Sequence, residues 1–232
     1  MDYRQYAKYF KPMNKIPLII SIVAAVVGAV LAAISIDTMA VGFILLVVGI
    51  IAAISIVTSR TKGEELDDYA ERLLKKTLDT MLKKTEMDLK YVKMYPPIIT
   101  GNYIYDGDVQ IKEDTDGSIR SSKYQISGML FSDNKVYIYK NLICFDSPDS
   151  EETCTEYRYA NFKSADVEEF VRNANEPNIN ITNKTLTYYH MNIRMADGST
   201  FVIPVNNDAT TDETIKVLNR RFEQKNAPKE NK

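Results

Sequence analysis

Two long uncharged runs near the N-terminus constrain this chain more than any other feature. The first run covers residues 16–36 and the second covers residues 39–57, and only Asp37 and Thr38 separate them. An α-helix rises ~1.5 Å per residue, so each run can cross the hydrocarbon core of a bilayer, which is about 30 Å thick. The sequence therefore predicts a transmembrane helical hairpin over residues 16–57 with a two-residue turn.

Two other structures were weighed for these runs. A secretory signal peptide has an apolar stretch of ~7–15 residues, whereas the first run is longer and is followed at once by a second. A pair of core helices in a soluble protein would need a larger remaining chain to cover both helices on all sides. The transmembrane hairpin therefore fits better than either alternative.

Basic residues lie beyond both ends of the predicted hairpin and are absent from its turn. We expect six of them at the membrane interface: Arg4, Lys8, Lys11, Lys15, Arg60 and Lys62. Short segments rich in Lys and Arg stay in the cytoplasm. The pattern thus predicts a multi-pass protein of the cell membrane with both termini cytoplasmic. Residues 1–15 are also rich in aromatic side chains, which fits either an interfacial helix or a disordered basic arm.

Small side chains indicate where the predicted helices pack. Gly28 lies on the first helix, and Gly42 and Gly49 lie two turns apart on the second. Helices in lipid approach closely where side chains are small. Two interpretations stay open, namely packing within the hairpin, or packing on a partner's helix or a second copy. Neither run contains an ionisable residue, which argues against an ion or proton pathway through the hairpin.

Residues 63–95 combine many charges with an apolar stripe and predict an amphipathic connector, mostly one long helix. Acidic residues fill its first turns, where they complement the helix dipole. The seam formed by Leu66, Ala70, Leu73 and Thr77 is weak for a coiled coil. We therefore expect this helix to pack on the domain that follows rather than on a copy of itself.

The rest of the chain predicts one β-rich domain, over residues 96–226, with about seven antiparallel strands. Its last element is an amphipathic helix over about residues 211–225, for which Thr210 and Glu213 make a capping box. Residues 227–232 form a polar tail.

The clearest hairpin of this domain covers residues 186–205. A three-residue loop that ends at Gly198, in the left-handed conformation, pairs Ile193 with Phe201 on one face. This register places His190, the single histidine, on the opposite face. We expect it to be a solvated strand residue, because no acid or nucleophile accompanies it in the sequence.

Two local questions stay open in the sequence. Cys144 and Cys154 lie opposite each other if the hairpin that carries them is symmetric. Two thiolates alone make a poor zinc site, so we favour two half-buried strand residues over a metal or redox pair. Residues 165–173 fit a short helix as well as a strand.

Three segments of the β-rich domain resemble a known family. They are Phe131–Tyr139, Tyr157–Ser164 and Asp197–Pro204, and a terminal helix follows them. Together with the hairpin, they resemble bacterial membrane proteins that carry a C-terminal pleckstrin-homology-like (PH-like, or GRAM-like) domain. The resemblance implies a membrane-anchored α+β protein, in which a bent antiparallel sheet or barrel is capped by a C-terminal helix. It also implies binding or scaffolding, although no residue matches a dedicated phosphoinositide motif.

Composition and motifs limit the function further. The net charge is −2 and no nucleic-acid-binding signature occurs, so nucleic acid is not an expected partner. No GxSxG, HExxH, P-loop or CxxC pattern occurs, so we expect no catalytic residues, cofactor or metal. The sequence predicts a non-enzymatic cytoplasmic module, tethered to the lipid bilayer, that binds a protein or a lipid headgroup. The alternative is a small subunit of a membrane complex whose hairpin assembles with itself or with a partner.

Overall fold

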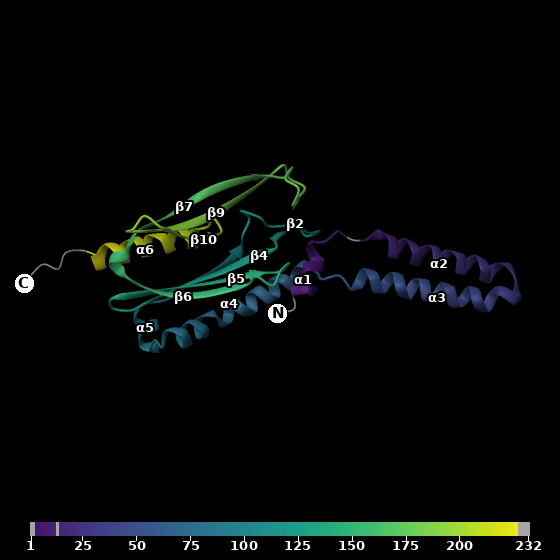
Figure 1. Cartoon of the computed structure of the whole chain (residues 1–232), viewed down its shortest axis with the longest axis horizontal. Helices are drawn as coiled ribbons and strands as arrows, with labels where there is room; N and C mark the ends of the chain where they lie inside the picture. The colour runs from purple at the N-terminus through teal and green to yellow at the C-terminus, as the bar shows by residue number, and fades with distance from the viewer. Residues whose placement is uncertain (1–2, 13, 227–232) are drawn as a thin grey trace, which may run out of the picture. The chain divides into compact units, whose positions relative to one another are not determined.

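The computed structural model describes residues 3–12 and 14–226 and has α+β architecture (Figure 1). Its helices are α1 (Tyr3–Phe10), α2 (Lys15–Ile34), α3 (Ile36–Thr58), α4 (Gly63–Thr85), α5 (Leu89–Met94) and α6 (Ala209–Asn226), with one 3₁₀ turn, η1 (Tyr159–Asn161). Its strands are β1 (Ile98–Tyr103), β2 (Ile111–Glu113), β3 (Ile119–Ser121), β4 (Lys123–Phe131), β5 (Lys135–Cys144), β6 (Glu151–Arg158), β7 (Phe162–Asn173), β8 (Ile179–Asn180), β9 (Thr185–Met195) and β10 (Thr200–Val205). Residues 11–62 form one compact unit, and residues 1–10 together with 63–232 form the other.

The first unit contains α2 and α3, which are long and apolar enough to cross a membrane by length and composition. The predicted turn at Asp37 and Thr38 is wrong, because only Ser35 lies outside the two helices. The Ser35 hydroxyl accepts a hydrogen bond from the Asp37 backbone N–H at 3.2 Å and so caps α3. The Thr38 hydroxyl donates to the Leu31 carbonyl at 2.8 Å, which closes the turn.

The predicted helix-packing glycines face the neighbouring helix inside this unit. A Cβ atom added to Gly42 would lie 2.3 Å from the backbone nitrogen of Ala32, and one added to Gly28 would lie 2.4 Å from that of Leu46. Gly49 approaches the α2 backbone in the same way. These three glycines therefore pack within the hairpin and do not face outward.

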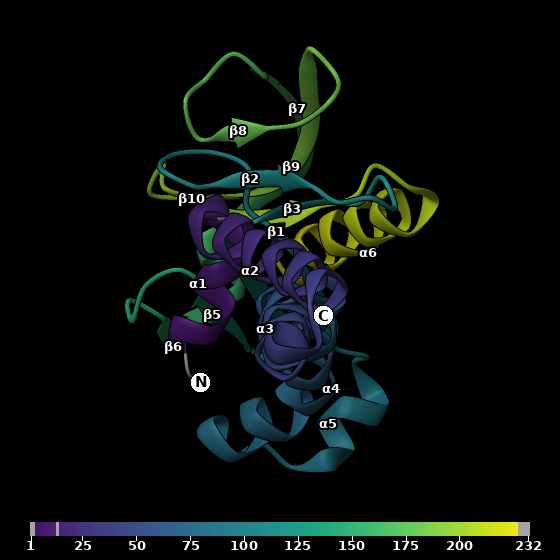
Figure 2. The ribbon, with the colours of Figure 1, turned by 90° about the vertical axis from the view of Figure 1, so that its right-hand side faces the viewer.

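The second unit contains two large antiparallel sheets and one small sheet. The four-stranded sheet has the order β1-β4-β5-β6, and the three-stranded sheet has the order β10-β9-β7. A third sheet, β3-β2-β8, includes a short parallel pair between β2 and β8, which lie side by side in Figure 2. Residues 165–173 belong to β7, since they pair along β9. This pairing decides between the strand and the helix that the sequence left open.

A first core fills the space between the two large sheets and α6. Its most deeply buried members are Met129, Phe131, Val136, Met191, Ile193, Ile203, Leu218 and Phe222. The ring of Phe222 on α6 stacks on Phe162 of β7, with centroids 4.9 Å apart. The predicted capping box of this helix is wrong, because the helix begins at Ala209. Asp208 is its cap and accepts a hydrogen bond from the Thr211 N–H at 2.9 Å.

A second core lies on the outer face of the four-stranded sheet, under α4 and α1 (Figure 1). Strand β4 is buried along most of its length because both of its faces are covered. Gly128 permits the close approach of α4, since an added Cβ atom would lie 2.4 Å from the Met81 sulfur. The prediction that the connector packs on the domain is confirmed. It is not one helix, however, because Glu86 has φ 51° and Asp88 caps the separate helix α5.

The aromatic side chains of the N-terminal arm contribute to the second core. The arm forms the helix α1, as one of the two sequence interpretations expects. The Tyr6 ring lies 5.4 Å from that of Tyr69 on α4 and 5.8 Å from that of Phe145. Tyr9 is buried at 3% exposure. These aromatic residues are therefore occupied by the protein core instead of being free for a headgroup layer.

The β9–β10 hairpin follows the predicted register. Ile193 lies opposite Phe201, and Gly198 has φ 88°, as a three-residue loop requires. The prediction of a solvated His190 is wrong, because this residue is only 5% exposed. Its face of the sheet is covered in part by Phe170, whose ring lies 4.8 Å from the imidazole.

The two cysteines are free and do not lie opposite each other. Cys144 pairs with Lys123 of β4, and Cys154 pairs with Tyr139. The condition of a symmetric hairpin is not met, because the register pairs Leu142 with Glu151 and so offsets the two cysteines along the strands. Burial raises the pKa of both thiols, so both stay protonated near neutral pH.

Candidate functional site

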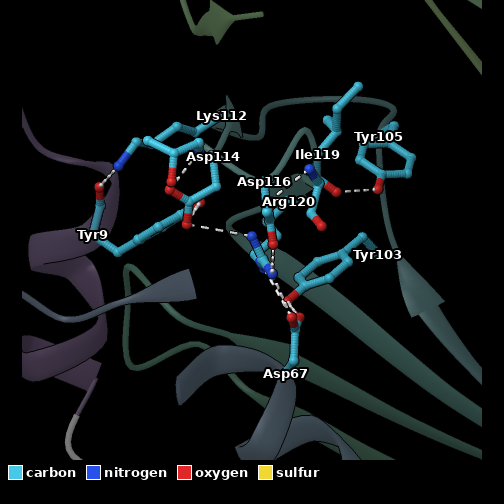
Figure 3. Close-up of polar contacts among 11 residues, drawn as sticks. Tyr9, Asp67, Tyr103, Tyr105, Lys112, Asp114, Asp116, Ile119 and Arg120 are labelled. Atoms are coloured by element: carbon cyan, nitrogen blue, oxygen red, sulfur yellow. Dashed lines mark hydrogen bonds and ion pairs between the residues drawn. The ribbon is translucent and has the colours of Figure 1, made fainter. Parts of the chain in front are cut away.

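One buried charge organises the second unit. Arg120, in β3, has a side chain only 4% exposed and is surrounded by three carboxylates (Figure 3). Its guanidinium lies 2.6 Å from Asp67, 3.4 Å from Asp114 and 3.5 Å from Asp116. Asp67 also accepts a hydrogen bond from the Tyr103 hydroxyl at 2.6 Å. A buried arginine is stable only when its charge is paired in this way.

The same cluster reaches α1 and the start of α4. The Tyr9 hydroxyl donates to the Asp114 carboxylate at 3.4 Å, and the Lys112 ammonium donates to the Tyr9 carbonyl at 3.2 Å and lies 3.9 Å from its ring centroid. Gly63, the first residue of α4, packs so closely on Arg120 that an added Cβ atom would lie 2.5 Å from the guanidinium. The cluster therefore holds α1, α4 and the β2–β3 hairpin together at one point.

Arg120 and the two tyrosines of the cluster keep their protons near neutral pH. Burial would lower the pKa of Arg120, but hydrogen bonds to Asp67 and Tyr9 outweigh it and raise that pKa. Burial raises the pKa of Tyr9 to about 12 and raises that of Tyr103 further. Donors that stay protonated across the physiological range suit a permanent joint between elements of the domain.

A second polar feature is a cleft of about 390 Å³ at one end of the two large sheets. Strands β4, β5, β9 and β10 and the segment after β1 line it. Its chemically distinctive residues are Asp106, Asp108, Lys123, Lys140 and His190. The core between the two large sheets is thus apolar and packs against α6, whereas this cleft is polar and open.

Unlike Arg120 and its carboxylates, several charged side chains of the cleft have no hydrogen bond or ion pair with the described residues. In the described part of the chain, Lys123, Lys140 and Asp106 have no side-chain hydrogen bond or ion pair. Asp108 accepts one long hydrogen bond, from the Asn178 amide at 3.4 Å. Two ammonium groups without carboxylate partners, on the walls of one cavity, are available to an external anion.

The ring nitrogens of His190 likewise have no hydrogen-bond partner within residues 3–12 and 14–226. No buried side-chain nitrogen or oxygen among the described residues lacks a partner, so these nitrogens are accessible, and His190 lines the cleft. Burial lowers the pKa of His190, whereas the charges of Asp106 and Glu168 oppose this shift. The imidazole is therefore mainly neutral at pH 7 and offers one donor and one acceptor.

The basic residues predicted at the membrane interface lie in both units. Five of the six, Arg4, Lys8, Lys11, Lys15 and Lys62, are exposed. Arg60 is half-buried, and its guanidinium donates to the Lys11 carbonyl at 3.0 Å, which links the two ends of the α2–α3 unit. Their role at a membrane stays a prediction.

Sequence reasoning did not single out the residues of either site. Asp67 was interpreted only as one of several acids in the first turns of a helix, and Arg120 and Lys123 carry no motif. Their roles depend on contacts between residues far apart in the chain, such as the 53 positions from Asp67 to Arg120. The sequence predicts His190 only as a solvated strand residue, because no acid or nucleophile accompanies it there.

Comparisons with known proteins do not assign the chain. No protein-family model, curated protein or solved structure matches it. Among the described residues, no group of three or more His, Cys, Asp or Glu side chains is arranged to hold a metal ion.

Proposed function

We propose that this protein is a non-enzymatic binding module tethered to the cell membrane, with α2 and α3 as its transmembrane anchor. The observation that carries this proposal is the Arg120 cluster. Helix α1 ends just before the α2–α3 unit and helix α4 begins just after it, and both are held by the same buried charge. The cluster thus joins, within the domain, the two chain segments that lead to the proposed anchor.

The cytoplasmic part is proposed to be a PH-like domain. The resemblance implies a bent antiparallel sheet that is capped by a C-terminal helix. A four-stranded and a three-stranded sheet that enclose one core, with α6 packed into it, support this assignment. The open cleft at the other end of the sheets is the surface that we propose for binding.

The alternative, a hairpin that assembles a membrane complex, has less support. It relied on outward-facing small residues, but Gly28, Gly42 and Gly49 pack within the hairpin. Many outward residues of α2 and α3 are large aliphatic side chains, such as Val26 and Ile44, which suit contact with lipid.

Labelling of single cysteines tests the anchor and its orientation. Both native cysteines are replaced by alanine. One cysteine is then introduced either at Thr38, in the first turn of α3 next to Ser35, or at Lys163, on the exposed surface of β7. Intact cells are treated with a membrane-impermeant maleimide. We expect T38C to react in intact cells and K163C to react only after permeabilisation. Equal reaction of both, or extraction of the protein by alkaline carbonate, would refute the proposal.

Crosslinking tests the binding role separately. Mild crosslinking in cells, gentle detergent extraction and mass spectrometry identify what is attached to the full chain. Crosslinks from the β4–β5 and β9–β10 walls of the cleft to another molecule are expected. Crosslinks confined to α2 and α3 would instead favour the membrane-complex alternative.

A further inference from the structure

We propose that the open cleft binds a small soluble organic anion, a carboxylate or a phosphate monoester, between Lys123 and Lys140 and against His190. This inference rests on the proposed binding function and names the ligand class of its cleft.

The two lysines are placed on one wall by the strand register. Lys140 of β5 lies opposite Ser127 of β4, and Lys123 is four residues from Ser127 along the same strand. Side chains alternate across a strand, so all three residues share one face. Long, flexible lysine side chains on a common face can converge on one anionic group. Neither lysine forms an ion pair with a carboxylate of the described residues.

The floor of the cleft is rigid, and its buried amide already has hydrogen-bond partners. Gln125 lies between the two lysines on the same face and is 4% exposed. Its amide donates to the Ser127 hydroxyl at 2.8 Å and to the Val202 carbonyl at 2.9 Å, which joins β4 to β10. The cleft is therefore a formed cavity between fixed walls. Its volume of about 390 Å³ lies in the range of small-molecule sites, roughly 300–1,000 Å³.

His190 supplies an independent reason to expect a ligand. The side chain is only 5% exposed, but its ring nitrogens are accessible and have no hydrogen-bond partner among the described residues. The rings of Phe170 and Tyr188, with centroids 4.8 Å and 5.3 Å from the imidazole, restrict its movement. A fixed donor that lines the same cavity as two unpaired cations can complete the coordination of an oxyanion.

The acidic residues of the cleft favour a soluble ligand over a membrane surface. Asp106 and Asp108 line the same cavity as the lysines. These two carboxylates offset the charges of the two lysines, so the cleft as a whole has no net positive charge to attract the negative surface of an anionic bilayer. A small anion that enters the cavity contacts the lysines without bringing an extended negative surface to the rim.

The single histidine makes a direct test practical. The full chain, labelled with ¹⁵N-histidine and purified in detergent through a tag that contains no histidine, is titrated with inorganic phosphate, and the imidazole resonances are followed by NMR. We expect a saturable shift of His190. K123Q and K140Q should each weaken phosphate binding by roughly tenfold or more, because each removes a charge-assisted hydrogen bond. K163Q, an exposed lysine on β7, is the matched control and should bind as the original protein does.

Three results would overturn the proposal. The first is a His190 signal that does not move with phosphate, and the second is a shift that is identical in K123Q, K140Q and K163Q. The third is a shift that appears with vesicles of phosphatidylglycerol but not with free phosphate, because the ligand would then be a lipid headgroup. The cysteine labelling of the anchor is independent of this titration. A negative titration would therefore refute the proposed ligand but not the proposed membrane anchor.

Discussion

Arg120 and Lys123 lie three positions apart in the chain and have opposite environments. Arg120 is enclosed by Asp67, Asp114 and Asp116, so its charge is used entirely within the protein. Lys123 lines an open cleft and has no ion pair with any described residue. The comparison shows that a positive charge can serve in two ways. A cation that is surrounded by carboxylates stabilises the fold, whereas a cation without such partners is available to a ligand.

The largest effect should come from breaking the enclosed site. Replacing Arg120 with Met removes its charge-assisted hydrogen bonds to Asp67 and Asp114, and the loss of hydrogen bonds to charged groups costs about 1.5–3 kcal/mol. Denaturant unfolding of the purified full chain, followed by circular dichroism, measures this loss. R220M removes an exposed arginine of α6 and should change stability by less than about 0.5 kcal/mol. Similar stabilities for R120M and R220M would show that the cluster is not a joint.

The packed seam between α2 and α3 is also enclosed, but it contains no charge. Gly42→Ala places a methyl group against the α2 backbone, and overpacking of this kind costs about 1–3 kcal/mol. V41L adds one methylene group on the neighbouring outward position, where the side chain is 57% exposed, and should be neutral. Unfolding in mixed micelles of increasing SDS content compares the two variants. If both variants unfold at the same SDS content, the packing of α2 on α3 does not depend on close approach at Gly42.

His190, in the open site, should make the free energy of unfolding of the protein depend on pH. Its pKa is lowered by burial in the folded protein, against the opposing charges of Asp106 and Glu168, so the folded state binds fewer protons than the unfolded state just below pH 6.5. Stability is therefore complete above about pH 6.5 and falls as the pH drops toward the folded pKa. Unfolding curves between pH 5 and 8 test this, and H190Q should flatten the dependence in that window. An unchanged pH profile in H190Q would show that another group titrates there.

The smallest effect on stability should come from the unpaired lysines. The double variant K123Q/K140Q removes two charges that make no ion pair within the described residues. Its free energy of unfolding should therefore change by no more than about 0.5 kcal/mol. The same denaturant measurement applies. A loss comparable to that of R120M would mean that these lysines are structural and that the contrast with Arg120 fails.

The sequence predicted local and periodic features well. The two apolar helices, the β9–β10 register and the packing of α4 on the domain follow from hydrophobic spacing and from turn residues such as Gly198. Single-residue details failed where two local signals compete, as at Ser35, which caps α3 although Asp37 and Thr38 interrupt the apolar runs. The sites were not predictable, because burial of His190 and pairing of Arg120 depend on contacts between distant segments.

Thermal unfolding with and without inorganic phosphate, on the original protein, R120M and K123Q/K140Q, tests the central distinction most directly. A ligand that binds only the folded state raises the melting temperature. We expect phosphate to raise the melting temperature of the original protein and of R120M, although R120M melts at a lower temperature. Without phosphate, K123Q/K140Q should melt like the original protein, and its melting temperature should not rise when phosphate is added. An equal rise in all three proteins, or no rise in any of them, would contradict the distinction between the two sites.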